Sequence, residues 1–436
     1  MAYAVARKFL TTTARQAKQV LTADNLLQGA HVVDGFITKP GALLKDGRYK
    51  IVRKLGRERF FNAFLVEDTK APKCDYYTRA MKYFSANIIS IDSSFSFSRA
   101  ICEIDISNAL TNPAKANFNP YLSPLHDHFA QRDAHGVHYC FLSEPLGLNA
   151  DAYRATSPSG RLPVHDVIPI IVPVAEALIS LHGLDIIHGD ISAVNVNFSD
   201  MGDEEIEKTI AMEPPNGSET FDFQSDVAFP GTPPRPWDGS PLDEEPLRAN
   251  EPKPSGDIGS FALRAPENLI RAECGKPIDI WAVGCLTYEL LTGKDLFQPP
   301  TAMDLPPDES MLLMQYALTG ETLDKKLIEQ SRVKDRYFDG DGNLIKAKAN
   351  PYPSQTIKSL LEQNTHSELT AKEIDAASQF IGDCLRLNPG DRKTALQVAM
   401  HDWLLTGWSV EPDEVQLSDD PPPPPPKPSY VTIDWP

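Results

Sequence analysis

The pattern of apolar and polar positions divides the chain into a strand-rich part and a helical part. Apolar and polar residues alternate as they do in half-buried strands, and the predicted strands are 49–55, 64–66, 80–84, 121–131 and 137–144. A helical stretch at 98–110 lies within this series, and after residue 144 the pattern is mostly helical. A sheet followed by helices is typical of an α+β fold. We therefore predict a small β-rich lobe at 47–144 and a larger helical lobe at 145–406.

Three segments depart from this order. Residues 1–46 are predicted to be an N-terminal extension. Residues 201–256 carry 13 acidic residues, 4 basic residues and 10 prolines, a composition that buries too little apolar surface to offset the entropy of ordering. We predict a flexible acidic insertion there. Residues 407–436 are predicted to be a disordered Pro-rich tail, in which Pro421–Pro428 is either a ligand for an SH3 or WW partner or a solvated segment.

The most apolar stretch, 167–187, is predicted to be a buried helix because prolines and polar residues interrupt it. No transmembrane segment and no membrane partner are expected. The first 23 residues contain no acid and four Lys or Arg residues, which fits either a mitochondrial transit peptide or a plain extension.

Charge and cysteine content narrow the classes of partner. The chain has 436 residues and a net charge of −18, so it should repel nucleic-acid phosphates and favour a basic protein partner. Its six cysteines form no C-x-x-C pair, which argues against a zinc site or a disulfide framework. We expect a reducing compartment, the cytoplasm or the nucleus.

The segment His188-Gly189-Asp190-Ile191-Ser192-Ala193-Val194-Asn195 carries the candidate chemistry. It places an Asp five residues before an Asn, on a loop that follows an apolar helix. The Asp190 carboxylate can orient an attacking hydroxyl and accept its proton, while the Asn195 amide oxygen can hold Mg²⁺. This arrangement suits phosphoryl transfer and occurs in protein kinases and in small-molecule kinases.

Downstream motifs separate these two classes. Ala265-Pro266-Glu267 is a complete A-P-E, Asp279 to Gly284 resembles a D-x-W-x-x-G helix, and Arg392 stands where protein kinases have the Arg that pairs with the A-P-E Glu. Over residues 47–406 the chain therefore resembles the eukaryotic protein kinases, and small-molecule kinases lack these motifs. The first strand at 49–56 and the segment Glu144-Pro145-Leu146-Gly147 resemble those of the SR-protein kinases and their fungal relatives.

This resemblance implies a bilobal α+β kinase fold, a monomer that binds ATP and Mg²⁺ and phosphorylates serine or threonine in basic, Arg/Ser-rich proteins. It implies that Lys82 grips the ATP phosphates with Glu103 as its partner, that Asp190 is the base and that Asn195 binds metal. The implied nucleotide-site residues are Leu55, Gly56, Ala63, Ala80, Lys82, Ser143, Glu144 and Leu146.

Three departures from the family pattern leave an alternative open. The Gly-rich loop has Glu58 and Phe61 where glycines are usual, and Ser192 replaces the catalytic-loop Lys. No D-F-G is identifiable, so the second metal ligand is unassigned; Asp222 is a candidate but lies inside the acidic insertion. The alternatives are an active serine/threonine kinase and a pseudokinase that acts as a binding module, with a small-molecule kinase as a remote third.

Overall fold

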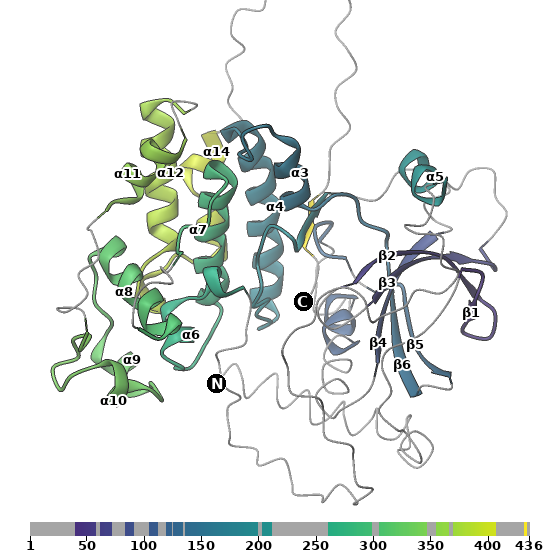
Figure 1. The fold of residues 1–436 in the computed structure, drawn as a ribbon, viewed down its shortest axis with the longest axis horizontal. Coiled ribbons are helices and arrows are strands. Elements are labelled where there is room, and N and C mark those ends of the chain that lie inside the picture. The colour runs from purple at the N-terminus through teal and green to yellow at the C-terminus, as the bar shows by residue number, and fades with distance from the viewer. Residues whose placement is uncertain are drawn as a thin grey trace, which may run out of the picture. The chain divides into compact units, whose positions relative to one another are not determined.

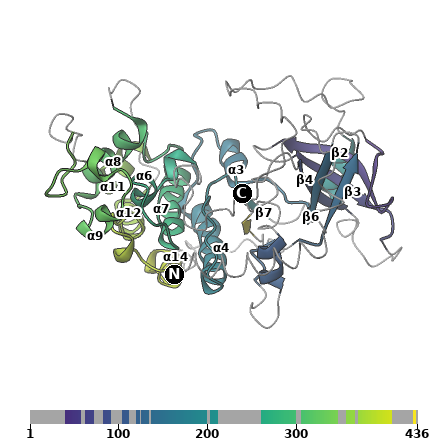
Figure 2. The ribbon, with the colours of Figure 1, turned by 90° about the horizontal axis from the view of Figure 1, so that it is seen from below.

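The computed structural model describes residues 40–57, 62–71, 83–90, 104–111, 119–123, 125–133, 136–198, 203–211, 260–298, 305–346, 355–365, 369–406 and 431–433. The chain divides into two compact units (Figures 1 and 2). Unit one comprises residues 1–118, 123–147 and 199–250. Unit two comprises residues 119–122, 148–198 and 251–436.

Unit one is built on a six-stranded antiparallel sheet. Its strands are β1 (Leu43–Leu44), β2 (Tyr49–Arg57), β3 (Asn62–Asp68), β4 (Tyr83–Ser90), β5 (Asp127–Asp133) and β6 (Gly136–Ser143), in the order β1-β2-β3-β4-β6-β5. Alternate residues of the strands point to one face and form a buried core that includes Ile51, Phe64 and Val66. The predicted strands are present, although β4 and β5 begin later than expected. Residues 104–111 are helical, in agreement with the predicted helix.

The sheet begins inside the segment predicted to be an N-terminal extension, so that boundary is wrong. Leu43 and Leu44 pair with β2, and Leu44 is buried in the core. Lys45 donates a 2.6 Å hydrogen bond to Asp127, which also accepts one of 2.7 Å from the hydroxyl of Tyr49. A two-residue strand is too short to give an alternating pattern, and these stabilising contacts come from residues about 80 positions away in sequence.

A second correction concerns the acidic insertion. Its residues Asp203–Ala211 form helix α5, although the composition predicted irregular chain over 201–256. Ile206 is fully buried against Leu65 and packs with Val52, so one apolar side chain anchors this helix on the sheet of unit one. The overall composition of a segment does not reveal that one of its apolar residues packs against a distant partner. Residues 212–256 lie outside the described residues.

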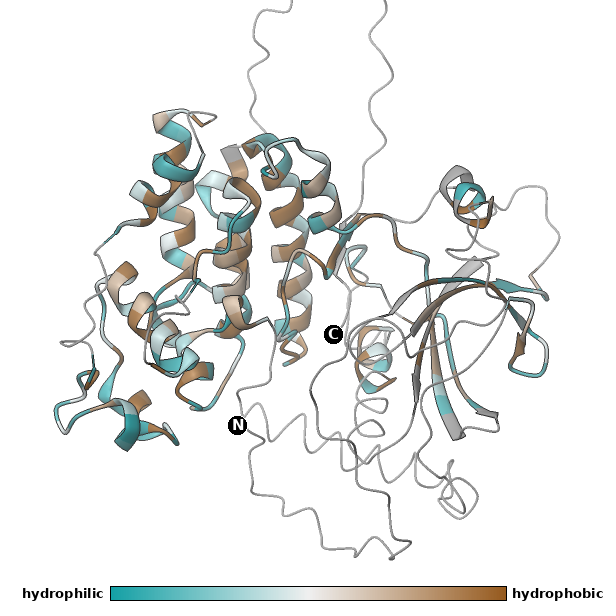
Figure 3. Cartoon of the chain, viewed as in Figure 1, coloured by the Kyte–Doolittle hydropathy of each residue, from teal (hydrophilic) through white to brown (hydrophobic). Residues whose placement is uncertain are grey.

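Unit two is mostly helical. Its helices are α3 (Ala150–Thr156), α4 (Val164–Gly183), α6 (Pro266–Leu269), α7 (Pro277–Thr292), α8 (Pro307–Thr319), α9 (Lys325–Glu329), α10 (Lys334–Tyr337), α11 (Ile357–Asn364), α12 (Ala371–Cys384), α13 (Ala395–Ala399) and α14 (Asp402–Thr406), with 3-10 turns at Phe261–Leu263 and Pro389–Asp391. Figure 3 shows how apolar residues concentrate on the central helices. Helix α7 packs against α4, α11 and α12.

Close packing at α7 depends on one glycine. A Cβ atom added at Gly284 would lie 2.8 Å from the Cβ of Cys384 on α12. Because glycine has no side chain, α7 and α12 approach each other more closely than any larger residue at this position would allow. Trp281, on the same helix, is fully buried and stacks on Phe297.

Helix α4 confirms the predicted buried helix. Val167, Leu178 and Leu181 are fully buried, and the helix continues through Pro169 and Pro173. It is the one helix in the described part of the chain that is long and apolar enough to cross a membrane, by length and composition only. Its packing within unit two accounts for that apolar composition.

The third correction concerns the C-terminal tail. Residues Val431–Ile433, predicted to be disordered, form strand β8, which pairs in antiparallel fashion with β7 (Val196–Phe198). In Figure 1 the yellow arrow of β8 lies beside β7. Residues 407–430, including the Pro-rich tract, lie outside the described residues.

Candidate active site

The loop at His188–Asn195 lies between α4 and β7, and α7 fixes its start. The buried carboxylate of Asp279 accepts hydrogen bonds from the backbone N–H groups of His188 at 3.0 Å and Gly189 at 2.8 Å. The Nε2 atom of His182 lies 2.9 Å from the same carboxylate. Gly189 has φ of 85°, in the left-handed region that glycine adopts without strain. The loop therefore leaves α4 in a fixed direction.

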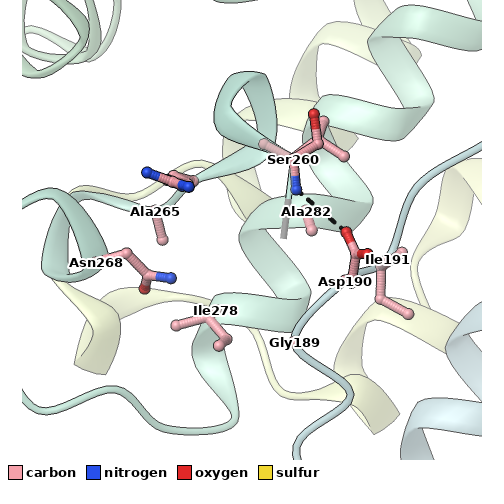
Figure 4. A pocket seen from close by; sticks show the side chains of 10 residues that line it. Gly189, Asp190, Ile191, Ser260, Ala265, Asn268, Ile278 and Ala282 are labelled. Atoms are coloured by element: carbon pink, nitrogen blue, oxygen red, sulfur yellow. Dashed lines mark hydrogen bonds between the residues drawn. The ribbon is translucent and has the colours of Figure 1, made fainter. Parts of the chain in front are cut away.

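Asp190 is held by its neighbours at both carboxylate oxygens. The Nδ2 atom of Asn195 donates to the Asp190 carbonyl oxygen at 2.9 Å and to its Oδ2 at 3.0 Å. The backbone N–H of Ser260 donates to Oδ1 at 3.2 Å (Figure 4). Asp190 and Ser260 also line a pocket with Arg264 and Asn268. A carboxylate oriented in this way, at the edge of a pocket, is suited to accept a proton from a bound hydroxyl.

Asn195 fits the role of a metal ligand. It is buried, and both side-chain hydrogen bonds that it makes within the described part of the chain use the amide nitrogen. This leaves the amide oxygen as the atom for a hard divalent cation, which prefers oxygen ligands. Asn195 can therefore offer one neutral oxygen ligand to a magnesium-type ion at this end of the loop.

Ser192 stands at the position that the sequence analysis assigns to a catalytic-loop lysine. Its side chain is buried, and no hydrogen-bond partner of its Oγ occurs among the described residues. The loop therefore has no cation at this position to offset negative charge on a transferring phosphoryl group.

The predicted pair of Glu267 and Arg392 is confirmed. Two 2.7 Å hydrogen bonds join the guanidinium to the carboxylate, and both side chains are almost fully buried, at 0% and 1% exposure. The remaining N–H groups of Arg392 donate to three backbone carbonyl oxygens, and the guanidinium lies 5.0 Å from the ring of Trp281. This pair ties the A-P-E segment to α7 and to the C-terminal helices.

Comparisons with known proteins agree with this geometry. The protein kinase domain model matches residues 248–404. This match includes the A-P-E segment, α7 and Arg392. The chain contains a protein kinase domain. It is related to the eukaryotic protein kinases, including the SR-protein kinases.

Three protein kinases illustrate how similar the chain is to known proteins. The DYRK-family kinase pom1 of Schizosaccharomyces pombe is 25% identical over 280 residues, which cover 64% of this chain and 21% of pom1. The serine/threonine-protein kinase SKY1 of Saccharomyces cerevisiae is 31% identical over 168 residues, 38% of this chain and 21% of SKY1. The human SRSF protein kinase 3 is 29% identical over 154 residues, 34% of this chain and 25% of that kinase. The match thus spans a quarter or less of these relatives.

A protein kinase domain implies ATP and a divalent metal, and several predicted nucleotide-site residues are described in unit one. Gly56 pairs with Ala63 across the β2–β3 ladder. Leu55 is 38% exposed, as several other large apolar side chains of the described residues are. Ser143, at the end of β6, is buried and small, and the chain continues through Glu144 and Leu146. The roles of these residues in nucleotide binding stay predictions.

Other predicted residues of the kinase domain fall outside the described residues. They are Glu58, Phe61, Ala80, Lys82, Glu103 and Asp222. Their roles stay predictions. The four residues that connect β2 to β3 contain no glycine, so the departure from a Gly-rich loop is a property of the sequence itself.

Sequence reasoning missed three contributors to the site. It did not assign Asp279 the task of holding the loop backbone, nor Ser260 the task of orienting Asp190 through its N–H group. It also missed β8, although the alternation of Val431, Thr432 and Ile433 is a weak strand signal. A backbone N–H has no signature in sequence, because every residue except proline carries one.

Proposed function

We propose that this chain is an ATP-dependent serine/threonine protein kinase. The observation that carries the proposal is the arrangement around Asp190, whose two oxygens are held by Asn195 and by the N–H of Ser260. In the proposed reaction Asp190 accepts the proton of the substrate hydroxyl as the hydroxyl attacks the terminal phosphorus of ATP; the bond from that phosphorus to the bridging oxygen breaks, and ADP leaves. Asn195 would contribute its amide oxygen to a divalent cation, and Lys82, paired with Glu103, would bind the phosphates.

The bound nucleotide and metal would supply the transferable phosphoryl group and neutralise its charge. The task of the chain is then to position the groups that react. The backbone N–H groups of His188 and Gly189 donate hydrogen bonds to the Asp279 carboxylate and so fix the start of the loop, and Asp190 keeps one orientation relative to α7. The buried Glu267–Arg392 pair holds the segment that leads from Ser260 into α6.

The proposed substrate is a basic protein segment rich in Arg and Ser. Support comes from the net charge of −18 and from the name of one relative, SRSF protein kinase 3. An acidic protein attracts cationic peptides and discriminates against acidic ones through long-range electrostatics. Binding should therefore weaken as ionic strength rises.

Transfer of labelled phosphate from Mg-ATP to an Arg-Ser repeat peptide tests the proposal. Wild-type protein should label this peptide, and a peptide with Ala in place of each Ser should stay unlabelled. Asp190→Asn should lower the rate by about 10²- to 10⁴-fold, the usual contribution of a general base. Absence of transfer by correctly folded wild-type protein, with Arg-Ser and acidic peptides alike, would refute the proposal.

A second candidate function is that of a pseudokinase that binds partners without catalysis. The buried Ser192 favours it, because the usual lysine would stabilise charge that develops on the transferring phosphoryl group. Thermal unfolding with ADP or ATP, with and without Mg²⁺, separates the two. A nucleotide shift that requires Mg²⁺ supports the kinase, and no shift with either nucleotide supports the pseudokinase.

A further inference from the structure

The C-terminal strand β8 is the outer strand of the small sheet that follows the candidate catalytic loop. Strand β7 begins at Val196, directly after Asn195, and β8 pairs with it in antiparallel fashion (Figure 1). Residues 199–430 separate the two strands in the sequence, so no short turn joins them. Strand β8 also lies against α4, the helix that precedes the loop. The last segment of the chain therefore contacts the elements on both sides of the loop.

Strand β7 is held along both of its edges. On one edge the N–H of Phe198 donates a 2.9 Å hydrogen bond to the carbonyl oxygen of Leu148, and Asn197 forms a bridge with Asn149. On the other edge β8 pairs with all three residues of β7. The position of β7, and of the residue before it, therefore depends on the segment at 148–149 and on β8 together.

The register of the ladder identifies which backbone groups of β8 face β7. In an antiparallel ladder, hydrogen-bonded pairs alternate with pairs whose backbone groups point to the outer edges. The N–H of Phe198 points to Leu148, so the N–H and C=O of Asn197 point to β8, where Asn197 is paired with Thr432. Asn197 and Thr432 are therefore the pair that exchanges two backbone hydrogen bonds. The N–H of Val431, one residue earlier, faces away from β7.

Burial links this pair to the candidate base. Val196 and Asn197 are only 1% and 9% exposed, so backbone groups of Asn197 that lost Thr432 would have little access to water. Asn195 directly precedes these residues, and its Nδ2 atom donates to the Asp190 carboxylate at 3.0 Å. A shift of β7 therefore moves the group that orients Asp190.

We propose that β8 is a positioning element of the candidate active site. Its pairing with β7 holds Asn195, and through Asn195 the Asp190 carboxylate, in the geometry used for phosphate transfer; the inference rests on the proposed kinase function. Asp279 fixes the start of the loop, and β8 fixes its end. A misplacement of about 1 Å in an active site can cost about 10²-fold in rate, so the activity of the whole chain depends on its last residues.

Hydrogen exchange in the full-length chain tests the pairing. Thr432→Pro removes the N–H that faces Asn197, so exchange at residues 196–198 should quicken by about 5- to 150-fold, the range expected for loss of two hydrogen bonds. Val431→Pro removes an N–H that faces away from β7, and the protection should remain. Exchange in α12 should be the same in every chain, which shows that unit two stays folded. Equal exchange at 196–198 in the two variants would overturn the argument from register.

Phosphate transfer to the Arg-Ser repeat peptide tests the link between β8 and the site. Thr432→Pro should lower kcat by at least about tenfold and leave the peptide KM within about twofold, because the orientation of Asp190 and Asn195 matters in the transition state. Ser418→Pro introduces the same residue into the tail outside β8 and is the matched control, with the kcat of the wild type. A higher peptide KM with unchanged kcat in Thr432→Pro would contradict a positioning role.

A peptide added to the full-length Thr432→Pro chain separates positioning from general damage to the fold. A synthetic peptide of residues 429–436 can add its strand to the edge of β7 that the variant leaves open. At about millimolar concentration, comparable with the effective concentration of a tethered segment, it should restore the exchange protection of β7 and most of kcat. The same peptide with Thr432→Pro should restore neither, and equal results with the two peptides would contradict the proposal.

Three outcomes distinguish failure of this inference from failure of the proposed function. Wild-type kcat in Thr432→Pro, with faster exchange at β7, would retain the kinase and refute the positioning role. Faster exchange at β7 in Thr432→Pro, with no phosphate transfer by the wild-type chain, would refute the kinase and retain β8 as the strand that orders the end of the loop. Exchange at β7 that stays slow in Thr432→Pro would refute the role of β8, whether or not the wild type transfers phosphate.

Discussion

Replacement of Arg392 by Ala should destabilise unit two more than any surface substitution. All five guanidinium N–H groups are used, two on Glu267 and three on backbone carbonyls, and the side chain has no solvent exposure. The variant leaves the Glu267 carboxylate buried without a cation, which costs about 3–5 kcal/mol in comparable pairs. For a unit of 150–250 residues each kcal/mol lowers Tm by about 2–4 °C, so a fall of at least about 6 °C is expected.

Thermal unfolding followed by tryptophan fluorescence measures this effect, because Trp281 lies against the Arg392 guanidinium. Arg392→Lys should fall between wild type and Arg392→Ala, since lysine keeps the charge but has three donors and no planar fork. Lys334→Ala removes an exposed pair with Glu329 and is the matched control, with an unchanged Tm. If Arg392→Ala shifted Tm no more than Lys334→Ala does, the buried pair would not stabilise the fold as argued.

Three more substitutions test packing, loop anchoring and pH dependence. Gly284→Ala should cost about 1–3 kcal/mol by overpacking. Gly183→Ala, at the end of α4, adds a Cβ that meets nothing within 4 Å, so it should raise the free energy of unfolding in urea by up to about 1 kcal/mol; equal effects would contradict the packing argument. Asp279→Asn should cost about 1–3 kcal/mol, because asparagine keeps one acceptor oxygen and presents an NH2 donor to the other backbone N–H, and hydrogen exchange should quicken at residues 188–189 but not in α12. Burial and neighbouring carboxylates, opposed by Arg154, raise the pKa of Glu289 to about 7 from 4.5. The folded chain therefore binds this proton more tightly than the unfolded chain, so the free energy of unfolding should fall as pH rises from about 4.5 to 7; a slope that Glu289→Gln leaves unchanged would exclude this residue as its source.

The sequence predicted those features whose signal is local. Alternation along 49–55 predicts β2, because burial of one face of a strand favours apolar residues at every second position. The mostly apolar stretch at 167–187, interrupted by prolines and polar residues, predicts the buried helix α4. The resemblance to protein kinases implies the Glu267–Arg392 pair, although the two residues lie 125 positions apart. The motifs also identify the loop that carries Asp190 and Asn195.

Only the tertiary structure decided the features that depend on a distant partner. Leu43 and Leu44 form a strand because β2 lies beside them, and α5 is anchored because Ile206 meets Leu65. Strand β8 follows a Pro-rich tract that predicts disorder, and its three residues are ordered by pairing with β7. Such short segments contribute too little of their own stability to impose a pattern on the sequence, since long-range contacts supply the free energy that orders them. The sequence alone thus identified the loop at 188–195 and the buried helix α4 that precedes it. Only the tertiary structure showed that the C-terminal strand β8 pairs with β7, which follows this loop.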